Sequence, residues 1–198
     1  MKIKLSDYKK LTGYDQQFTS FFQDSLAKAE NLYGGRIPNC DIEGFEFKQN
    51  EANPYMYIED NGFVKNVTII LPEDCYGKEI SYEFISHETI HCLAPAPKGI
   101  PAKVIEEGLA EYFRIANLKT HNMGYHQYAS GVDSEKYNLA RSYVEQLIKI
   151  NPTSIKEVRK IQPMIYLTSN SDLLKILSNN HQDLIDILVS DFDKLPSK

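Results

Sequence analysis

The residues best suited to chemistry lie in SHETIHCLAP, residues 86–95, where two histidines stand four positions apart and a glutamate follows the first. On a helix, residues four apart lie on one face, one turn above the other. The imidazoles of His87 and His91 can therefore reach one metal ion at about 2.0–2.1 Å. Glu88 is turned about 100° around the axis, which suits contact with a water molecule better than metal ligation.

A third ligand is expected on the next predicted helix, residues 102–118, because catalytic zinc usually takes three protein ligands and one water. Glu107 and Glu111 lie on one stripe of this helix. Glu107 completes a His–His–Glu set, and Glu111 is placed to accept the free N–H of a ligating histidine. Glu107→Ala should therefore lose zinc affinity, whereas Glu106→Ala should not. The alternative is a solvated helix face, on which Glu111 and Arg114 form an i,i+3 ion pair.

The combined sequence SHETIHCLAP…IPAKVIEEGLAEYF resembles the gluzincin metallopeptidases, whose third ligand is a glutamate on the helix after H-E-x-x-H. It is most similar to a compact bacterial group with the pattern lPxWlsEGlAeY. The resemblance covers about residues 80–150 and implies a zincin-like fold with one Zn²⁺ ion. It implies His87, His91 and Glu107 as ligands and Glu88 as catalytic base. Val104 stands where that group often has Trp, a difference expected to alter packing and not chemistry.

The resemblance continues in YNLARSYVEQL, residues 137–147, which is similar to the YxKGxxxxxxL helix of related aminopeptidases. The tyrosine of that helix donates a hydrogen bond to the oxyanion, and Tyr137 falls on its position. Leu139 and Ala140 replace the Lys and Gly of the pattern. A phenol aimed at developing negative charge can contribute to catalysis. The alternative is that Tyr137 only packs in the core or on the helix surface.

The loop of residues 119–132, KTHNMGYHQYASGV, is long and rich in aromatic and histidine side chains. A loop with this composition is expected to line a site. His121, Tyr125 and His126 are therefore rivals of Tyr137 for the oxyanion role, or candidates for binding substrate.

The elements expected to position these residues make up an α+β fold. In this fold an N-terminal helix and a small, mainly antiparallel sheet precede the helix that carries His87 and His91. Helical spacing predicts a helix over residues 14–33, and aromatic and β-branched runs predict strands over 42–49, 55–59 and 63–71. Asn61-Gly62 predicts a hairpin between the last two. Residues 66–71 either form the sheet edge that pairs with an extended substrate, as in gluzincins, or an interior strand.

The second half of the chain is predicted to be helical. The expected helices are residues 79–94, 102–118, 134–150 with Asp133 or Ser134 as N-cap, 153–161, 170–180 and 181–195. Gly108 would let its helix approach a neighbouring helix closely, although glycine lowers helix propensity by about 1 kcal/mol relative to alanine. The chain is expected to form a single domain, residues 1–198. It would consist of an α/β lobe to about residue 95 and a helical lobe from about residue 96.

Composition narrows the classes of function. A net charge of −5 gives no basic patch for nucleic acid, and no run of eighteen apolar residues predicts a membrane span. MKIKLSDYKK lacks the apolar segment of a Sec signal, so a cytoplasmic location is expected. Three cysteines without metal-type spacing disfavour a disulfide framework, and Cys92 is expected to be a core residue and not a fourth ligand.

Together these features predict a zinc-dependent peptidase that acts on a peptide or protein substrate. Two alternatives use the same scaffold: a metal-binding or regulatory module without turnover, and a metal-dependent hydrolase of a non-peptide amide or ester. The aminopeptidase motif GxMEN is absent, so no exopeptidase activity is inferred.

Overall fold

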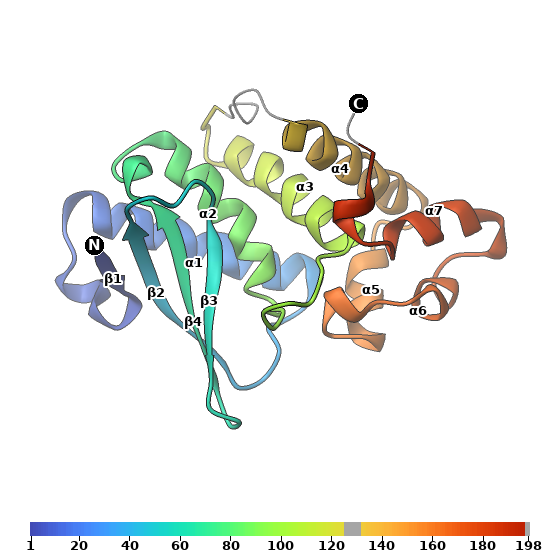
Figure 1. The fold of residues 1–198 in the computed structure, drawn as a ribbon, viewed down its shortest axis with the longest axis horizontal. Helices are drawn as coiled ribbons and strands as arrows, with labels where there is room; N and C mark the ends of the chain where they lie inside the picture. The colour runs from blue at the N-terminus through green and yellow to red at the C-terminus, as the bar shows by residue number, and fades with distance from the viewer. Residues whose placement is uncertain (125–131, 197–198) are drawn as a thin grey trace.

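The computed structural model describes residues 1–124 and 132–196, without the side chains of residues 132–134, and its fold is α+β as predicted (Figure 1). The first half contains β1 (Lys2–Lys4), α1 (Gly13–Tyr33), β2 (Cys40–Lys48), β3 (Tyr55–Asp60) and β4 (Lys65–Pro72). The second half contains α2 (Glu79–His91), α3 (Val104–Thr120), α4 (Val132–Ile150), α5 (Ser154–Ile161), α6 (Asn170–Leu174) and α7 (Gln182–Leu188). No helix in the described part of the chain is long and apolar enough to cross a membrane.

The sheet is mixed, with the strand order β1-β2-β4-β3. The outer pairings, β1 with β2 and β3 with β4, are antiparallel, as expected for most of the sheet. The central pairing of β2 with β4 is parallel, which the sequence did not predict. β4 is therefore an interior strand, and the edge strand beside it is β3. Of the two interpretations of residues 66–71, the substrate-pairing edge is wrong.

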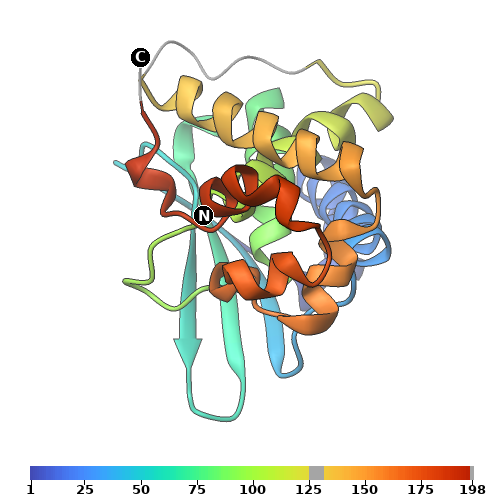
Figure 2. The same cartoon turned by 90° about the vertical axis from the view of Figure 1, so that its right-hand side faces the viewer.

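The predicted hairpin joins β3 to β4 and projects beyond the helices in both views (Figures 1 and 2). The Asn61 side chain accepts hydrogen bonds from the backbone N–H groups of Phe63 and Val64, at 3.0 and 2.9 Å. Gly62 follows with a φ of 82°, a left-handed conformation that glycine adopts without a steric penalty. The turn chemistry read from Asn61-Gly62 is thus confirmed.

α1 covers the inner face of the sheet and supplies its aromatic core. Phe18 and Phe22 of this helix contact Phe45 of β2, with ring centroids 5.0 and 5.1 Å apart. The same buried cluster continues into α2 through Ile85 and into α3 through Leu109. α2, which carries His87 and His91, is therefore held by the same core that supports the sheet. Cys92, just beyond α2, is also buried in this cluster.

α3 packs between α2 and α4, and a glycine sets its distance from α4 (Figure 1). A Cβ atom built on Gly108 would lie 2.4 Å from the carbonyl oxygen of Ala140 and 2.8 Å from a methyl group of Val144. Real Cβ atoms do not come so close to a backbone oxygen, so only glycine allows this approach. The close approach expected of Gly108 is confirmed.

The C-terminal segment fixes the start of α3. The backbone N–H of Val104 donates to the Ser190 carbonyl at 3.0 Å, and that of Phe192 donates to Ala102 at 2.8 Å. The predicted helix 181–195 is therefore too long, since the chain leaves α7 after Leu188 to form this pairing. For the same reason α3 starts at Val104, two residues later than predicted.

Three other predicted helix boundaries are wrong. The predicted helix 79–94 ends at His91 in α2. The predicted helix 170–180 ends at Leu174 in α6. The predicted N-caps Asp133 and Ser134 fall inside α4, which starts at Val132.

Candidate metal centre

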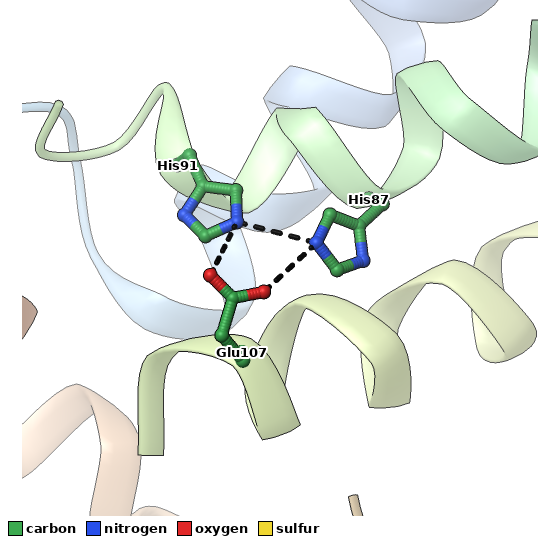
Figure 3. Close-up of side chains that lie close together, drawn as sticks. All are labelled: His87, His91 and Glu107. Carbon is green, nitrogen blue, oxygen red and sulfur yellow. Dashed lines mark hydrogen bonds and ion pairs between the residues drawn. The ribbon is translucent and has the colours of Figure 1, made fainter. Parts of the chain in front are cut away.

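His87 and His91 project from one face of α2 toward α3 (Figure 3). Both imidazoles are buried, and their Nε2 atoms lie 3.3 Å apart. The four-residue spacing places the rings one turn apart, as the sequence predicted. The apolar opposite face of α2 packs into the core through Ile85, which keeps this helix in place.

Glu107 projects from α3 into the space between the two imidazoles (Figure 3). Its Oε2 lies 3.2 Å from Nε2 of His87, and its Oε1 lies 3.6 Å from Nε2 of His91. Ligand atoms about 2.0–2.1 Å from a tetrahedral ion lie roughly 3.3–3.4 Å from one another. The three side chains therefore form a buried group that could hold a metal ion, with the spacing such an ion requires.

Glu111 lies one turn after Glu107 on α3 and faces the other nitrogen of His87. Its Oε2 is 3.9 Å from Nδ1 of His87, which is longer than a hydrogen bond. Both carboxylate oxygens instead accept hydrogen bonds from Arg114, at 2.8 and 2.5 Å, and Arg114 also donates to Glu83. These groups are buried, so the alternative of a solvated helix face is wrong, while the Glu111–Arg114 pair is present.

Glu106 is a residue whose position the sequence did not predict. It precedes Glu107 on α3, and its Oε1 lies 3.1 Å from Nδ1 of His91. Only 2% of its surface is exposed. The expectation that Glu106→Ala keeps its zinc affinity was made without this contact with His91. The sequence positions of Glu106 and Glu107 did not predict this contact, because it depends on how α2 and α3 cross.

Glu88 lies buried beside the candidate ligands, and it lines a cleft that they border. Burial raises the pKa of its carboxyl group, and the nearby His91 and His87 offset only part of that effect. Burial would also raise the pKa of Glu107, but His91 and His87 lower it below its usual value. Glu107 is thus favoured as an anion, while Glu88 holds a proton more readily than an exposed glutamate.

The surrounding carboxylates raise the pKa of both imidazoles. Burial alone would lower the pKa of both rings, but contacts with Glu107 and Glu111 raise that of His87 to about 9. Glu107 and Glu106 likewise raise the pKa of His91 to about 10. Burial opposes ionisation of Glu111 as well, yet His87 and Arg114 lower its pKa to about 2. The carboxylates around the two imidazoles therefore favour positive charge on these rings.

A cleft of about 240 Å³ opens beside this group. One side is formed by Pro54, Tyr55 and Met56, which lie at the start of β3 or just before it. Three apolar residues from the segment between α2 and α3 also line it: Ala96, Ile100 and Ala102. An edge strand, the candidate ligands and an apolar segment therefore meet in one concave site.

Tyr137 of α4 reaches the cleft. Its ring centroid is 5.5 Å from that of His87 and 4.8 Å from that of Phe192. The residue therefore lies next to the candidate ligands and also packs in the core. His121, the rival at the end of α3, contacts Phe21 instead and does not line the cleft. The other rivals, Tyr125 and His126, lie outside the described residues.

Comparisons of the chain with protein-family models, with curated proteins and with solved structures find no match.

Proposed function

We propose that this protein is a zinc-dependent peptidase. The observation that carries the proposal is the convergence of two imidazole nitrogens and one carboxylate, 3.2–3.6 Å apart, beside a buried glutamate in a cleft. The ligands would be His87, His91 and Glu107. Two nitrogens and one oxygen, with a position left for water, are the donor set of many catalytic zinc sites. A bound zinc ion would supply Lewis-acid chemistry and lower the pKa of a coordinated water to about 7.

Glu88 would act as the general base and then as the general acid. Its carboxylate takes a proton from the attacking water while the water oxygen bonds to the scissile carbonyl carbon. The same group passes the proton to the amine as the carbon–nitrogen bond breaks. Because burial raises the pKa of Glu88, its conjugate base accepts a proton more readily near neutral pH than an exposed carboxylate does.

Tyr137 would stabilise the negative charge that develops on the carbonyl oxygen. Its phenol group can donate a hydrogen bond to that oxygen, and α4 is held next to the ligands by the contact of Gly108 with Ala140. A donor placed in advance costs no reorganisation when the charge develops. Packing against Phe192 restricts the ring, which favours such placement.

A peptide is the substrate that the cleft favours. β3 pairs with β4 on one side only, so its other edge is open in the described sheet, and its first residues line the cleft. An extended peptide can add to an open strand edge through main-chain hydrogen bonds. That mode would place a peptide bond, and not an isolated ester, next to the candidate ligands.

The test compares the wild-type protein with Glu88→Gln on a peptide library and on a panel of esters and non-peptide amides, with the zinc content of both proteins measured by mass spectrometry. We expect both proteins to carry one zinc ion and only the wild type to cleave peptides. Cleavage by Glu88→Gln would contradict the role of Glu88 as base. Zinc binding without cleavage by the wild type would favour the metal-binding module, and cleavage of esters or non-peptide amides alone would favour the other hydrolase.

A further inference from the structure

The closest carboxylate contact in the metal centre, apart from the ligands themselves, is made by Glu106. Its Oε1 lies 3.1 Å from Nδ1 of His91, within hydrogen-bond distance. The corresponding pair on the other histidine, Glu111 with His87, is 3.9 Å apart. Both oxygens of Glu111 also accept hydrogen bonds from Arg114, whereas Glu106 makes no such ion pair in the described residues.

Oε2, the second carboxylate oxygen of Glu106, is buried and has no hydrogen-bond partner among the described residues. A buried carboxylate with an unpaired oxygen is unfavourable unless nearby positive charge compensates it. The group that it contacts is the imidazole of His91, whose other nitrogen points at the candidate metal position.

We propose that Glu106 is a positioning residue of the metal centre, which accepts the Nδ1–H of His91 and aims Nε2 of that ring at the ion. The proposal rests on the zinc site proposed above. A carboxylate in this position fixes the tautomer of the ring and raises its basicity as a ligand. Glu106 would therefore increase the zinc affinity of the protein, although it does not touch the ion.

A purely structural role for Glu106 makes a different prediction. The residue lies in the first turn of α3, where a negative side chain also interacts favourably with the helix dipole. In that case its loss would lower the stability of the zinc-free protein and leave the zinc affinity of the folded protein unchanged. Glu106→Gln separates the two roles, because it keeps the size of the side chain and an acceptor oxygen but removes the charge.

The experiment measures zinc affinity by competition with a chromophoric chelator for the wild type, Glu106→Gln, Glu106→Ala and Glu79→Gln. Glu79 is an exposed glutamate on α2, so Glu79→Gln removes the same charge from the helix that carries the histidines. We expect Glu106→Gln to lose about 10-fold in affinity and Glu106→Ala up to about 100-fold, the range typical of such partners. Glu79→Gln should bind zinc as the wild type does.

A spectroscopic measurement accompanies the affinities. In the zinc-loaded wild type, the Nδ1 proton of His91 should give a resolved, slowly exchanging resonance in proton NMR. In zinc-loaded Glu106→Ala this resonance should shift or broaden, and that of His87 should be retained.

Wild-type affinity in Glu106→Gln and Glu106→Ala, together with an unchanged His91 resonance, would overturn the proposal and leave the zinc site intact. A wild-type protein that binds no zinc would overturn the site and the role of Glu106 together. The two failures are distinguished by the wild-type measurement alone.

Discussion

Glu88, Glu106, Glu107 and Glu111 carry the same carboxyl group, but the atoms around each one differ. Glu107 faces two imidazole nitrogens, and this contact lowers its pKa and keeps it anionic. Glu88 makes no comparable hydrogen bond within residues 1–124 and 132–196, and burial raises its pKa. An anion suits a ligand and a raised pKa suits a base, so the local environment supports the roles inferred from the spacing.

The sequence was sufficient to predict the residues whose relation is fixed by one helix. His87, Glu88 and His91 follow from the helical repeat alone. Glu107 followed because a zinc ion needs a third ligand and the next helix offered one. Glu106 was missed because its contact with His91 crosses from α3 to α2, and a difference of one residue along α3 turns a side chain by about 100°.

Tyr137→Phe tests the role of a single hydroxyl group. The phenyl ring should keep the contacts with His87 and Phe192, so the fold and the zinc affinity should not change. Loss of one donor to the oxyanion should lower kcat by about 10²–10³-fold, with little change in KM. Steady-state kinetics on a cleaved peptide provide the measurement. An unchanged kcat would assign Tyr137 to packing alone.

At the scale of elements, the strands and helices could be predicted but not their pairing. The β3–β4 hairpin is local and was read correctly from Asn61-Gly62. The parallel pairing of β2 with β4 joins segments that are separated by β3, and no local pattern encodes it. Because β4 pairs with β2 on one side and β3 on the other, β3 is the edge strand next to the cleft. The ends of α3 and α7 were also misplaced, because the Ser190–Val104 hydrogen bond is non-local.

Gly108→Ala tests the contact between α3 and α4. Alanine should favour an isolated helix by about 1 kcal/mol, but its Cβ atom would meet the Ala140 carbonyl oxygen at 2.4 Å. Because a backbone atom cannot move aside easily, the substitution should lower the free energy of unfolding by about 1–3 kcal/mol. It should also displace α4 and lower kcat through Tyr137. Urea unfolding and peptide kinetics measure the two effects.

Gly35→Ala is the matched control for this substitution. A Cβ atom at Gly35 would meet no atom within 4 Å, so stability and kcat should change little. An equal loss of stability in both variants would show that the contact with Ala140 is not the cause. A gain of stability in Gly108→Ala would mean that α4 can shift without cost.

At the scale of the whole molecule, the metal centre concentrates negative charge inside the fold. Among the described residues, five buried carboxylates lie in or next to this candidate centre: Glu83, Glu88, Glu106, Glu107 and Glu111. The guanidinium of Arg114 pairs with two of them, Glu83 and Glu111. Buried charges are unfavourable unless they are paired. Protonated imidazoles can compensate part of this charge in the metal-free protein, and a divalent ion can compensate it when bound.

Zinc should therefore stabilise the folded chain. An ion that binds only the folded state adds about 4 kcal/mol to the free energy of unfolding when its free concentration is 1,000 times Kd. Removal of zinc by a chelator should lower Tm, and added zinc should restore it, as followed by circular dichroism. Glu107→Ala, which removes a ligand from α3, should unfold at the same temperature with and without zinc. If chelation leaves the Tm of the wild type unchanged, or if zinc stabilises Glu107→Ala equally, the His87–His91–Glu107 group is not the site through which the ion acts.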